Sequence, residues 1–263
     1  MRTHLLPSAG IVFGIPWIVF GIQHFMYADF VSGLVPAYLP VRIFWAYLTG
    51  VAMIAAGISF IIRRQVRLAA FLLGCMLLLF ILMLHTRLLS GEPQVGMHWT
   101  RALQDTAIMA AAFGLSLSYG PAFFPLLSSE KASIIIKYCY ALPLVVLGAQ
   151  HFTHNAFVTA KIPAWFPLID VFDYLIGIVL IAGAYGLLFT VKIAWTASTL
   201  GVILVVLAFL QHVPLLAANI RNAVEWTGFM LDLALAAGAF IISACTSPPQ
   251  RSGEQASASM LPG

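Results

Sequence analysis

The stretch of sequence that decides the fold is residues 67–86, RLAAFLLGCMLLLFILMLHT, which carries no charged side chain between its first residue and His85. A transmembrane helix needs about 20 predominantly apolar residues, and this stretch has that length. The other stretches of this kind are residues 9–28, 43–62, 100–119, 135–154, 170–190, 193–213 and 225–244. Because backbone groups in lipid must pair within their own segment and no alternating strand pattern is present, we expect helices. The predicted fold is an all-α, polytopic membrane protein with eight transmembrane helices.

The composition of the 263-residue chain agrees with a membrane protein. Hydrophobic residues make up 62% of it and charged residues only 8%, whereas a soluble domain carries about 25% charged residues. These values exclude a soluble enzyme, a disordered scaffold and a nucleic-acid-binding protein. The three cysteines, Cys75, Cys139 and Cys245, form no Cys-x-x-Cys pair, which argues against a disulfide framework and a thiol–disulfide relay within this chain.

Lys and Arg are distributed unequally between the two ends of the predicted helices. The N-terminal side would carry Arg2, Arg63, Arg64, Arg67, Lys131, Lys137, Lys192 and Arg251. The opposite side would carry Arg42, Arg87, Arg101, Lys161 and Arg221. Because cytoplasmic loops hold the excess of Lys and Arg, both termini are predicted to lie in the cytoplasm, with the protein in the inner (cytoplasmic) membrane.

The sequence repeats itself at a fixed offset of 127 residues. GIQHF at residues 21–25 returns as GAQHF at 148–152, and PAYLP at 36–40 returns as PAWFP at 163–167. Each copy holds four predicted helices, an even number, so both copies should insert in the same orientation. We therefore predict two tandem four-helix bundles, at residues 1–127 and 128–245, followed by a disordered polar tail at 246–263. The two proline-rich segments cannot continue a helix and are expected to form lids or interfacial turns.

Both copies have kept a short set of polar residues within or beside the spans. The pairs are Gln23 and Gln150, His24 and His151, His85 and His212, Trp99 and Trp226, and Asp105 and Asp232. Polar groups in a membrane span are costly unless they are partnered, so retention in both copies indicates a shared role. All of them should lie near the extracytoplasmic end. Asp105, Asp232, His24 and His151 are the candidate catalytic residues. The candidate cofactor-binding residues are Gln23, His24, His85, Gln150, His151, His212, Trp99 and Trp226. No metal site is predicted.

Each of these residues has more than one interpretation. The histidines can bond across helices, bind a lipophilic head group or ligate haem iron. The aspartates can handle protons or simply orient an imidazole. The tryptophans are typical of interfacial anchors. Arg101 lies one turn from Asp105 and could pair with it, whereas Asp232 needs a His or Gln partner from across the bundle. Arg87 becomes Pro214 in the second copy, so the copies need not be equivalent, and the sequence leaves open which one is active.

Several of these motifs resemble the DoxX-like family of small membrane proteins. The resemblance rests on Gly-x-Gln-His-Phe, the Phe-Val and VPAYLP that follow it, FWAYLTG at residues 44–50 and RLAA at 67–70. It covers roughly residues 10–119 and 137–244, as if two four-helix units had been fused. The resemblance implies one four-helix bundle per unit and an association with quinone-linked redox complexes.

Three functions are consistent with these observations. The leading hypothesis is an integral membrane subunit of a quinone-linked redox system, which binds a quinone-like lipophilic partner near the extracytoplasmic side and works with a redox partner protein. The second is a non-catalytic lipid-binding or complex-assembly protein. The third is a bis-His haem b protein, with iron held by His24 and His85 or by His151 and His212.

Overall fold

The computed structural model describes residues 2–121, 123, 129–153, 168–190 and 192–246. Its helices are α1 (Arg2–Met26), α2 (Ala28–Leu34), α3 (Arg42–Ile61), α4 (Val66–Phe80), the π-helix η1 (Ile81–His85), α5 (Thr86–Gly91), α6 (Gly96–Ser118), α7 (Ser129–Thr153), α9 (Ile169–Phe189), α10 (Ile193–Ala218) and α11 (Ala223–Thr246). The described part of the chain has no strand, and the all-α prediction is confirmed. The second proline-rich segment (163–167) lies outside the described residues, as does the predicted tail beyond residue 246.

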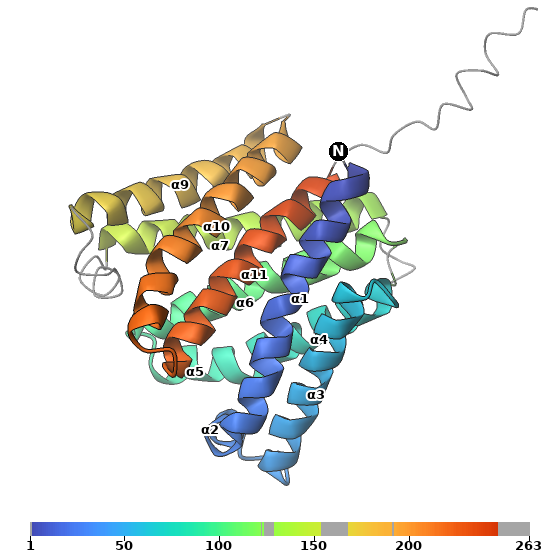
Figure 1. Ribbon diagram of the computed structural model, residues 1–263, viewed down its shortest axis with the longest axis vertical. Coiled ribbons are helices and arrows are strands. Elements are labelled where there is room, and N and C mark those ends of the chain that lie inside the picture. Colours follow the sequence, from blue (N-terminus) through green and yellow to red (C-terminus); the bar gives the residue numbers. More distant parts are fainter. Residues whose placement is uncertain (1, 122, 124–128, 154–167, 191, 247–263) are drawn as a thin grey trace, which may run out of the picture.

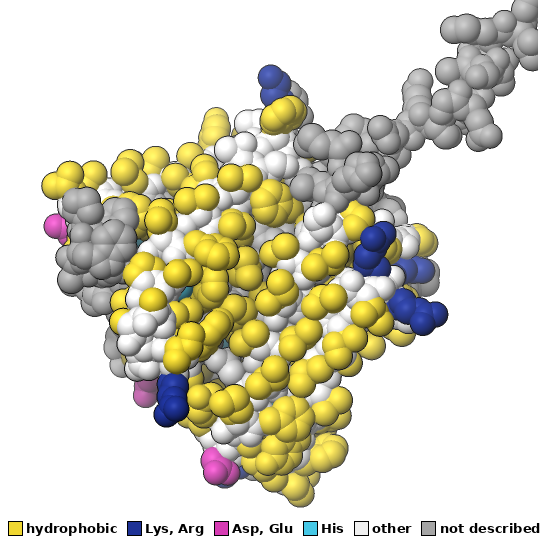
Figure 2. Space-filling model, in the orientation of Figure 1, with side chains coloured by type: hydrophobic (Ala, Val, Ile, Leu, Met, Phe, Trp, Pro, Cys, Tyr) yellow, Lys and Arg dark blue, Asp and Glu magenta, His cyan; other side chains and the backbone are white. Residues whose placement is uncertain are grey.

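In the part of the chain that the structure describes, seven helices are long and apolar enough to cross a membrane. They span Leu6–Met26, Arg42–Ile61, Val66–Gly91, Ser129–Thr153, Ile169–Phe189, Ile193–Ala218 and Ala223–Cys245. The stretch predicted at residues 100–119 corresponds to α6, which is not among the seven. Its first half carries Arg101, Gln104 and Asp105, and such side chains lower the hydropathy of a segment. In Figure 2 hydrophobic side chains cover most of the visible face, and Lys and Arg gather at its edges. The chain is therefore a multi-pass membrane protein.

The helices of the two copies pack in the same order. In the first copy α1 packs on α3, α3 on α4 and α4 on α6, and in the second α7 packs on α9, α9 on α10 and α10 on α11. Between the copies α1 contacts α11, α7 contacts α6, and α6 crosses α11 at the centre of the molecule (Figure 1). The last helix of each copy therefore packs against the first helix of the other copy. The two bundles predicted from the sequence are in contact through these helices.

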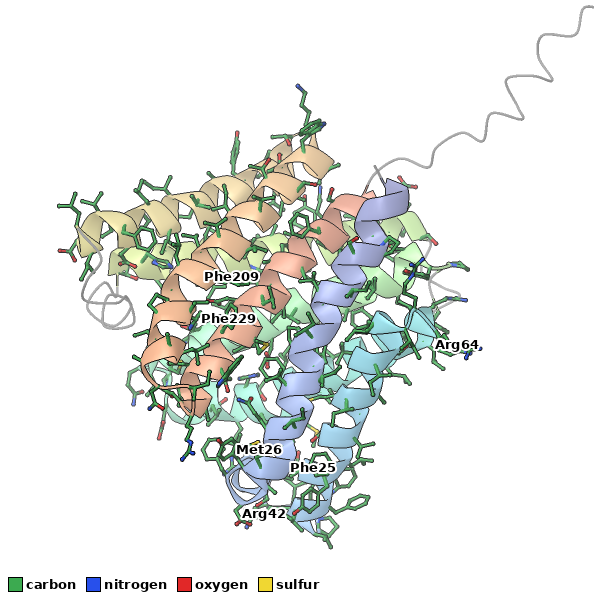
Figure 3. All side chains as sticks on the ribbon, viewed as in Figure 1. Phe25, Met26, Arg42, Arg64, Phe209 and Phe229 are labelled. Atoms are coloured by element: carbon green, nitrogen blue, oxygen red, sulfur yellow. The ribbon has the colours of Figure 1, made fainter. Side chains whose placement is uncertain are left out.

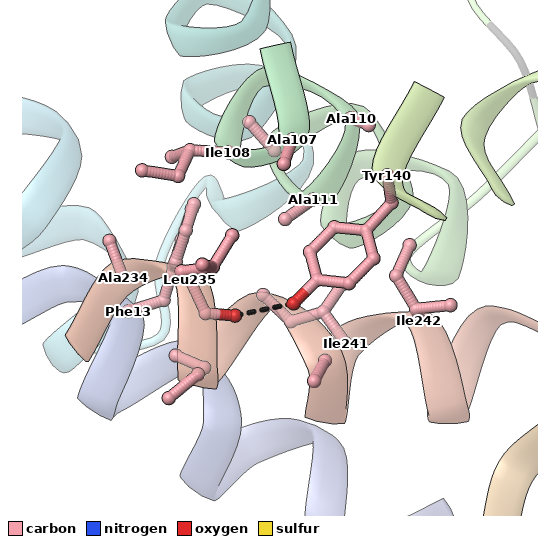
Figure 4. Close-up of a cluster of buried hydrophobic side chains, with 14 of the residues drawn as sticks. Phe13, Ala107, Ile108, Ala110, Ala111, Tyr140, Ala234, Leu235, Ile241 and Ile242 are labelled. Carbon is pink, nitrogen blue, oxygen red and sulfur yellow. Dashed lines mark hydrogen bonds between the residues drawn. The ribbon is translucent and has the colours of Figure 1, made fainter. Parts of the chain in front are cut away.

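Small residues build the central crossing of α6 and α11. A Cβ atom added to Gly238 of α11 would lie 2.9 Å from the Cβ of Ala111 on α6, so the two backbones approach closely. Figure 4 shows Tyr140 of α7 in this cluster, where its hydroxyl donates to the carbonyl oxygen of Leu235 at 2.6 Å. Phe13, its counterpart in the first copy, lies in the same fully buried cluster.

Glycines bring each Gln-His motif against its neighbouring helix. A Cβ atom on Gly50 of α3 would lie 2.9 Å from the Cβ of His24, and one on Gly177 of α9 would lie 2.9 Å from the Cβ of His151. The helices therefore approach closely at the same place in both copies. We use the name distal end for one end of the molecule. At this end α1 and α7 have their C-termini, and α6 and α11 have their N-termini. Figure 3 places Arg42 at this end and Arg64 well away from it.

Candidate functional site

The polar centre of the second copy is His212, on α10. Its Nδ1 lies 3.0 Å from Oε2 of Glu225, and its Nε2 lies 3.1 Å from Oδ2 of Asp232. The imidazole is buried, with 5% of the residue exposed. Glu225 belongs to the first turn of α11, and Asp232 lies about two turns deeper on the same helix. These three residues are called the His212 triad.

The residues around the ring explain its position. A Cβ atom on Gly228, between the two carboxylates on α11, would lie 2.8 Å from Cε1 of His212. Only a glycine therefore leaves room for the imidazole here. The ring of Phe229 lies 5.8 Å from the imidazole, and Phe209 packs edge-on against Phe229 at 5.2 Å (Figure 3). Phe229 therefore places apolar surface beside the imidazole, and Phe209 packs against Phe229.

The first copy contributes two polar side chains to this site. Gln104 of α6 donates from Nε2 to Oδ1 of Asp232 at 3.3 Å, and Arg101 donates from Nη1 to Oε1 of Gln104 at 3.1 Å. Asp232 thus has a histidine partner and a glutamine partner, where the sequence predicted one or the other. Arg101 bonds to Gln104, whereas the sequence suggested a pairing with Asp105. The site is consequently assembled from both copies.

A cavity of about 280 Å³ lies against the triad. The polar residues that line it are Thr100, Arg101, Gln104, Gln150, His151, Gln211, His212, Glu225 and Asp232. The apolar residues that line it are Met97, Leu147, Ile176, Leu180, Leu204, Leu207, Ala208, Val224 and Leu235. Apolar walls with a few convergent polar groups are typical of small-molecule sites. A second hollow of about 320 Å³ lies beside it, and both are lined by Gln150.

A second imidazole on the cavity wall also has a carboxylate partner. Nδ1 of His151 lies 2.6 Å from Oδ1 of Asp173, a residue of α9 that is fully buried. The corresponding position of the first copy is Ala46, which is fully buried as well. A buried carboxylate is costly unless it is paired. His151 supplies the partner that allows Asp173 to be buried.

The first copy has a simpler arrangement at its distal end. Nε2 of His85 lies 2.8 Å from Oδ2 of Asp105, and Nδ1 of His85 is buried with no hydrogen-bond partner among the described residues. The place of Glu225 is taken by His98, which bonds to the exposed Glu92 at 3.0 Å. Nδ1 of His24 lies 2.8 Å from the carbonyl oxygen of Phe20 in its own helix. A π-helix ends at His85, and such turns are frequent at functional sites.

The glutamines of the two motifs join the copies to each other. Thr227 donates from Oγ1 to Oε1 of Gln23 at 3.2 Å, and Thr100 donates to Oε1 of Gln150 at 2.9 Å. Each bond connects the first helix of one copy to the last helix of the other. Gln23 and Gln150 therefore both have a structural role. Gln150 also lines the cavity.

The two tryptophans have matching local roles. Trp99 donates from Nε1 to the carbonyl oxygen of Pro93 at 2.9 Å, and Trp226 donates to that of Ile220 at 2.8 Å. Each indole thus fixes the loop before its own helix. Neither lines the cavity beside the triad, although Trp99 lines the second hollow.

Sequence reasoning missed Glu225, Gln104, Gly228 and Asp173. The signal was present, because an acidic or amide side chain inside an apolar span is a functional candidate by itself. The requirement that a residue be retained in both copies removed them, since the matching positions hold His98, Leu231, Arg101 and Ala46.

Haem and a quinone-like ligand, the two predicted cofactors, require different side chains around them. The described residues hold no cluster of three or more His, Cys, Asp or Glu side chains that could bind a metal ion. Iron ligation needs a free ring nitrogen, but both nitrogens of His212 face carboxylates. The arrangement therefore gives no support to haem at the His151 and His212 pair. A quinone-like ligand needs hydrogen-bonding groups beside an apolar wall, and the cavity offers both.

Comparison with known proteins gives one match. A family described as "Domain of unknown function (DUF8561)" matches residues 13–113, which belong to the first copy of the repeat. No curated protein and no solved structure matches the chain. The DoxX-like resemblance of the motifs therefore stays a prediction.

Proposed function

We propose that this protein is a membrane subunit of a quinone-linked redox system and binds a quinone-like lipophilic partner in the cavity beside the His212 triad. The observation that carries the proposal is the His212 triad, which places a buried, hydrogen-bonded imidazole beside a cavity that many apolar side chains line. A quinone has an apolar ring and carbonyl oxygens that require hydrogen bonds and protons. Histidine and carboxylate side chains supply both near neutral pH.

The contacts suggest a division of roles along the cavity wall. Asp232 and His212 would face one carbonyl oxygen of the ligand, while Arg101 and Gln150 are the donors available to the rest of its head group. Leu204 and similar side chains would contact the ring. The DoxX-like resemblance supports this reading, because it implies association with a redox partner protein that supplies the electrons.

The proposal includes a membrane arrangement. We infer eight spans in two same-orientation copies, with both termini in the cytoplasm and the cavity near the extracytoplasmic side of the inner membrane. Supporting this, α6 packs against α4, α7 and α11, so protein rather than lipid can receive its polar side chains. The like order of helix contacts in the two copies supports the repeat. The excess of Lys and Arg supports the orientation.

A second candidate function is a non-catalytic lipid-binding or complex-assembly protein. The bonds of Gln23 to Thr227 and of Gln150 to Thr100 favour it, because they use the retained polar residues to hold the copies together. Under this alternative, His24→Ala and Asp232→Asn would lower thermal stability and leave any redox phenotype unchanged. Under the leading proposal, Asp232→Asn would weaken quinone binding in protein that still folds.

The deciding experiment combines an optical spectrum, organic extraction and ligand binding on detergent-purified protein. We expect a colourless preparation that yields quinone near one equivalent and binds decylubiquinone. Yield of phospholipid alone, with no decylubiquinone binding, would contradict the proposal and favour the assembly role. A Soret band that disappears in His24→Ala or His151→Ala would instead identify a haem protein.

A further inference from the structure

We propose that the His212 triad stores one exchangeable proton and presents it to an oxygen atom of the ligand in the cavity, with Glu225 as the positioning residue that retains the proton. The inference rests on the proposed function for the identity of the ligand. The stored proton itself follows from the geometry of three side chains and does not depend on the ligand.

The first step is the hydrogen-bond inventory of the ring. A neutral imidazole has one N–H group and one lone pair, whereas an ionised carboxylate can only accept hydrogen bonds. Carboxylate oxygens lie 3.0 Å from Nδ1 and 3.1 Å from Nε2 of His212. A neutral ring between two ionised carboxylates would direct a lone pair at one of them. The triad therefore holds one additional proton, either on the ring or on one carboxyl group.

The second step is the surroundings, which keep that proton in place. Glu225 and Asp232 bring two negative charges to one buried ring, and the groups that face them across the cavity are Arg101 on α6 and the His151–Asp173 pair of α7 and α9. Arg101 offsets only one of the carboxylates. In a low-dielectric site an unbalanced charge is costly, so a positive imidazolium between the two carboxylates is favoured.

The third step is the direction of transfer. The side chain of Asp232 is 30% exposed and lines the cavity, whereas that of His212 is 6% exposed. The N–H bond at Nε2 breaks, the proton passes through the Asp232 carboxylate, and an O–H bond forms on the ligand. His212 is left neutral, with its remaining N–H at Nδ1 directed to Glu225. Reduction of a quinone takes up two electrons and two protons. The electrons come from the redox partner protein, the triad supplies one proton, and solvent water supplies the second proton.

The first copy provides an internal comparison. His85 has a single carboxylate partner, Asp105, and its Nδ1 has no hydrogen-bond partner among the described residues. A neutral ring with its N–H on Nε2 satisfies that arrangement. The additional proton is therefore specific to the second copy, because only there does a glutamate face the ring.

Two measurements test the inference on the full-length protein. Nitrogen-15 NMR of histidine-labelled protein in bilayers, without ligand, should show a doubly protonated His212 ring at neutral pH. Glu225→Gln keeps a hydrogen-bonding side chain but removes the charge, and should reduce that population at least about tenfold. Glu225→Asp should restore it, and Glu92→Gln, on the exposed His98 pair, should leave it unchanged. Decylubiquinone affinity should fall about tenfold in Glu225→Gln, because a charge-assisted donor is lost.

The outcomes separate the inference from the proposed function. An unchanged His212 spectrum in Glu225→Gln would overturn the stored proton, and a changed spectrum with unchanged affinity would overturn its delivery to the ligand. If wild-type protein binds no decylubiquinone, the proposed function fails while the ligand-free spectrum still decides the stored proton. If Glu225→Gln does not fold, the inference is tested on wild-type protein alone. A nitrogen-15 spectrum of that protein with no doubly protonated His212 ring at neutral pH would overturn the inference.

Discussion

The two copies of the repeat contain the same histidine–aspartate pair in different surroundings. His85 and Asp105 lie 2.8 Å apart in the first copy, and His212 and Asp232 lie 3.1 Å apart in the second. In the first copy the imidazole has one carboxylate. In the second it has two, through Glu225, and it stands beside a cavity. The same pair therefore occurs at both positions, and the side chains around it differ.

The divergence follows from the way in which the copies pack. Because α6 and α11 cross at the centre, Gln104 of the first copy reaches Asp232 of the second. Its counterpart Leu231 can offer no such bond to the first copy. Gly228 makes room for the His212 ring, where the first copy has Arg101. The comparison teaches that a symmetric scaffold of glycines, tryptophans and Gln–Thr bonds carries an asymmetric polar site.

The sharpest way to break the comparison is to remove each imidazole in turn. We expect His212→Ala to weaken decylubiquinone binding roughly 10–100-fold, since a buried, charge-assisted partner of the ligand is lost. His85→Ala should change it less than about threefold. Equilibrium binding to purified, monodisperse protein measures both. Equal losses in the two variants would show that the copies are functionally alike.

Asp173 offers the next largest effect. Asp173→Ala gives the second copy the residue of the first, Ala46, and leaves His151 without its carboxylate. We expect the free energy of unfolding to fall by about 1–3 kcal/mol, as measured by SDS titration in mixed micelles. Asp170→Ala, an exposed carboxylate in the first turn of the same helix, is the control. A loss no greater than in the control would mean that the His151 pair adds nothing to stability.

Gly228→Ala tests the room made for the imidazole. The added Cβ would lie 2.8 Å from Cε1 of His212, so the ring must move and at least one carboxylate contact lengthens. Affinity for decylubiquinone should fall about fivefold to tenfold, consistent with roughly 1 kcal/mol for a weakened hydrogen bond. Gly33→Ala, where an added Cβ meets nothing within 4 Å, should have no such effect. Unchanged affinity in Gly228→Ala would remove the explanation for this glycine.

The smallest effects are expected where the copies are most alike. Gln23→Leu and Gln150→Leu each remove one hydrogen bond between the copies. Each should lower the free energy of unfolding by about 0.6 kcal/mol, the usual value for such bonds in membranes. Only Gln150→Leu should also weaken decylubiquinone binding, because only Gln150 lines the cavity beside the triad. A binding loss in both variants would point to a second ligand site in the first copy.

The sequence predicted much of the site because polar residues are conspicuous in apolar spans. It placed His85 with Asp105 and His212 with Asp232 at one end of the molecule, and it assigned Asp232 a histidine or glutamine partner. It did not identify Glu225 or Asp173, because comparing the two copies favours what they share. A ligand site that is assembled from both copies depends on residues that are not repeated.

By itself the sequence determined the membrane class and the helical fold, and it indicated a repeat, because apolar length and a fixed 127-residue offset can be read without any contact between helices. Only the tertiary structure decided that the last helix of each copy lies against the first helix of the other. That packing sets which side chains meet across the centre. Gln104, His212 and Asp232 lie around one cavity because the three helices α6, α10 and α11 converge there, and no periodicity along the chain specifies such a convergence.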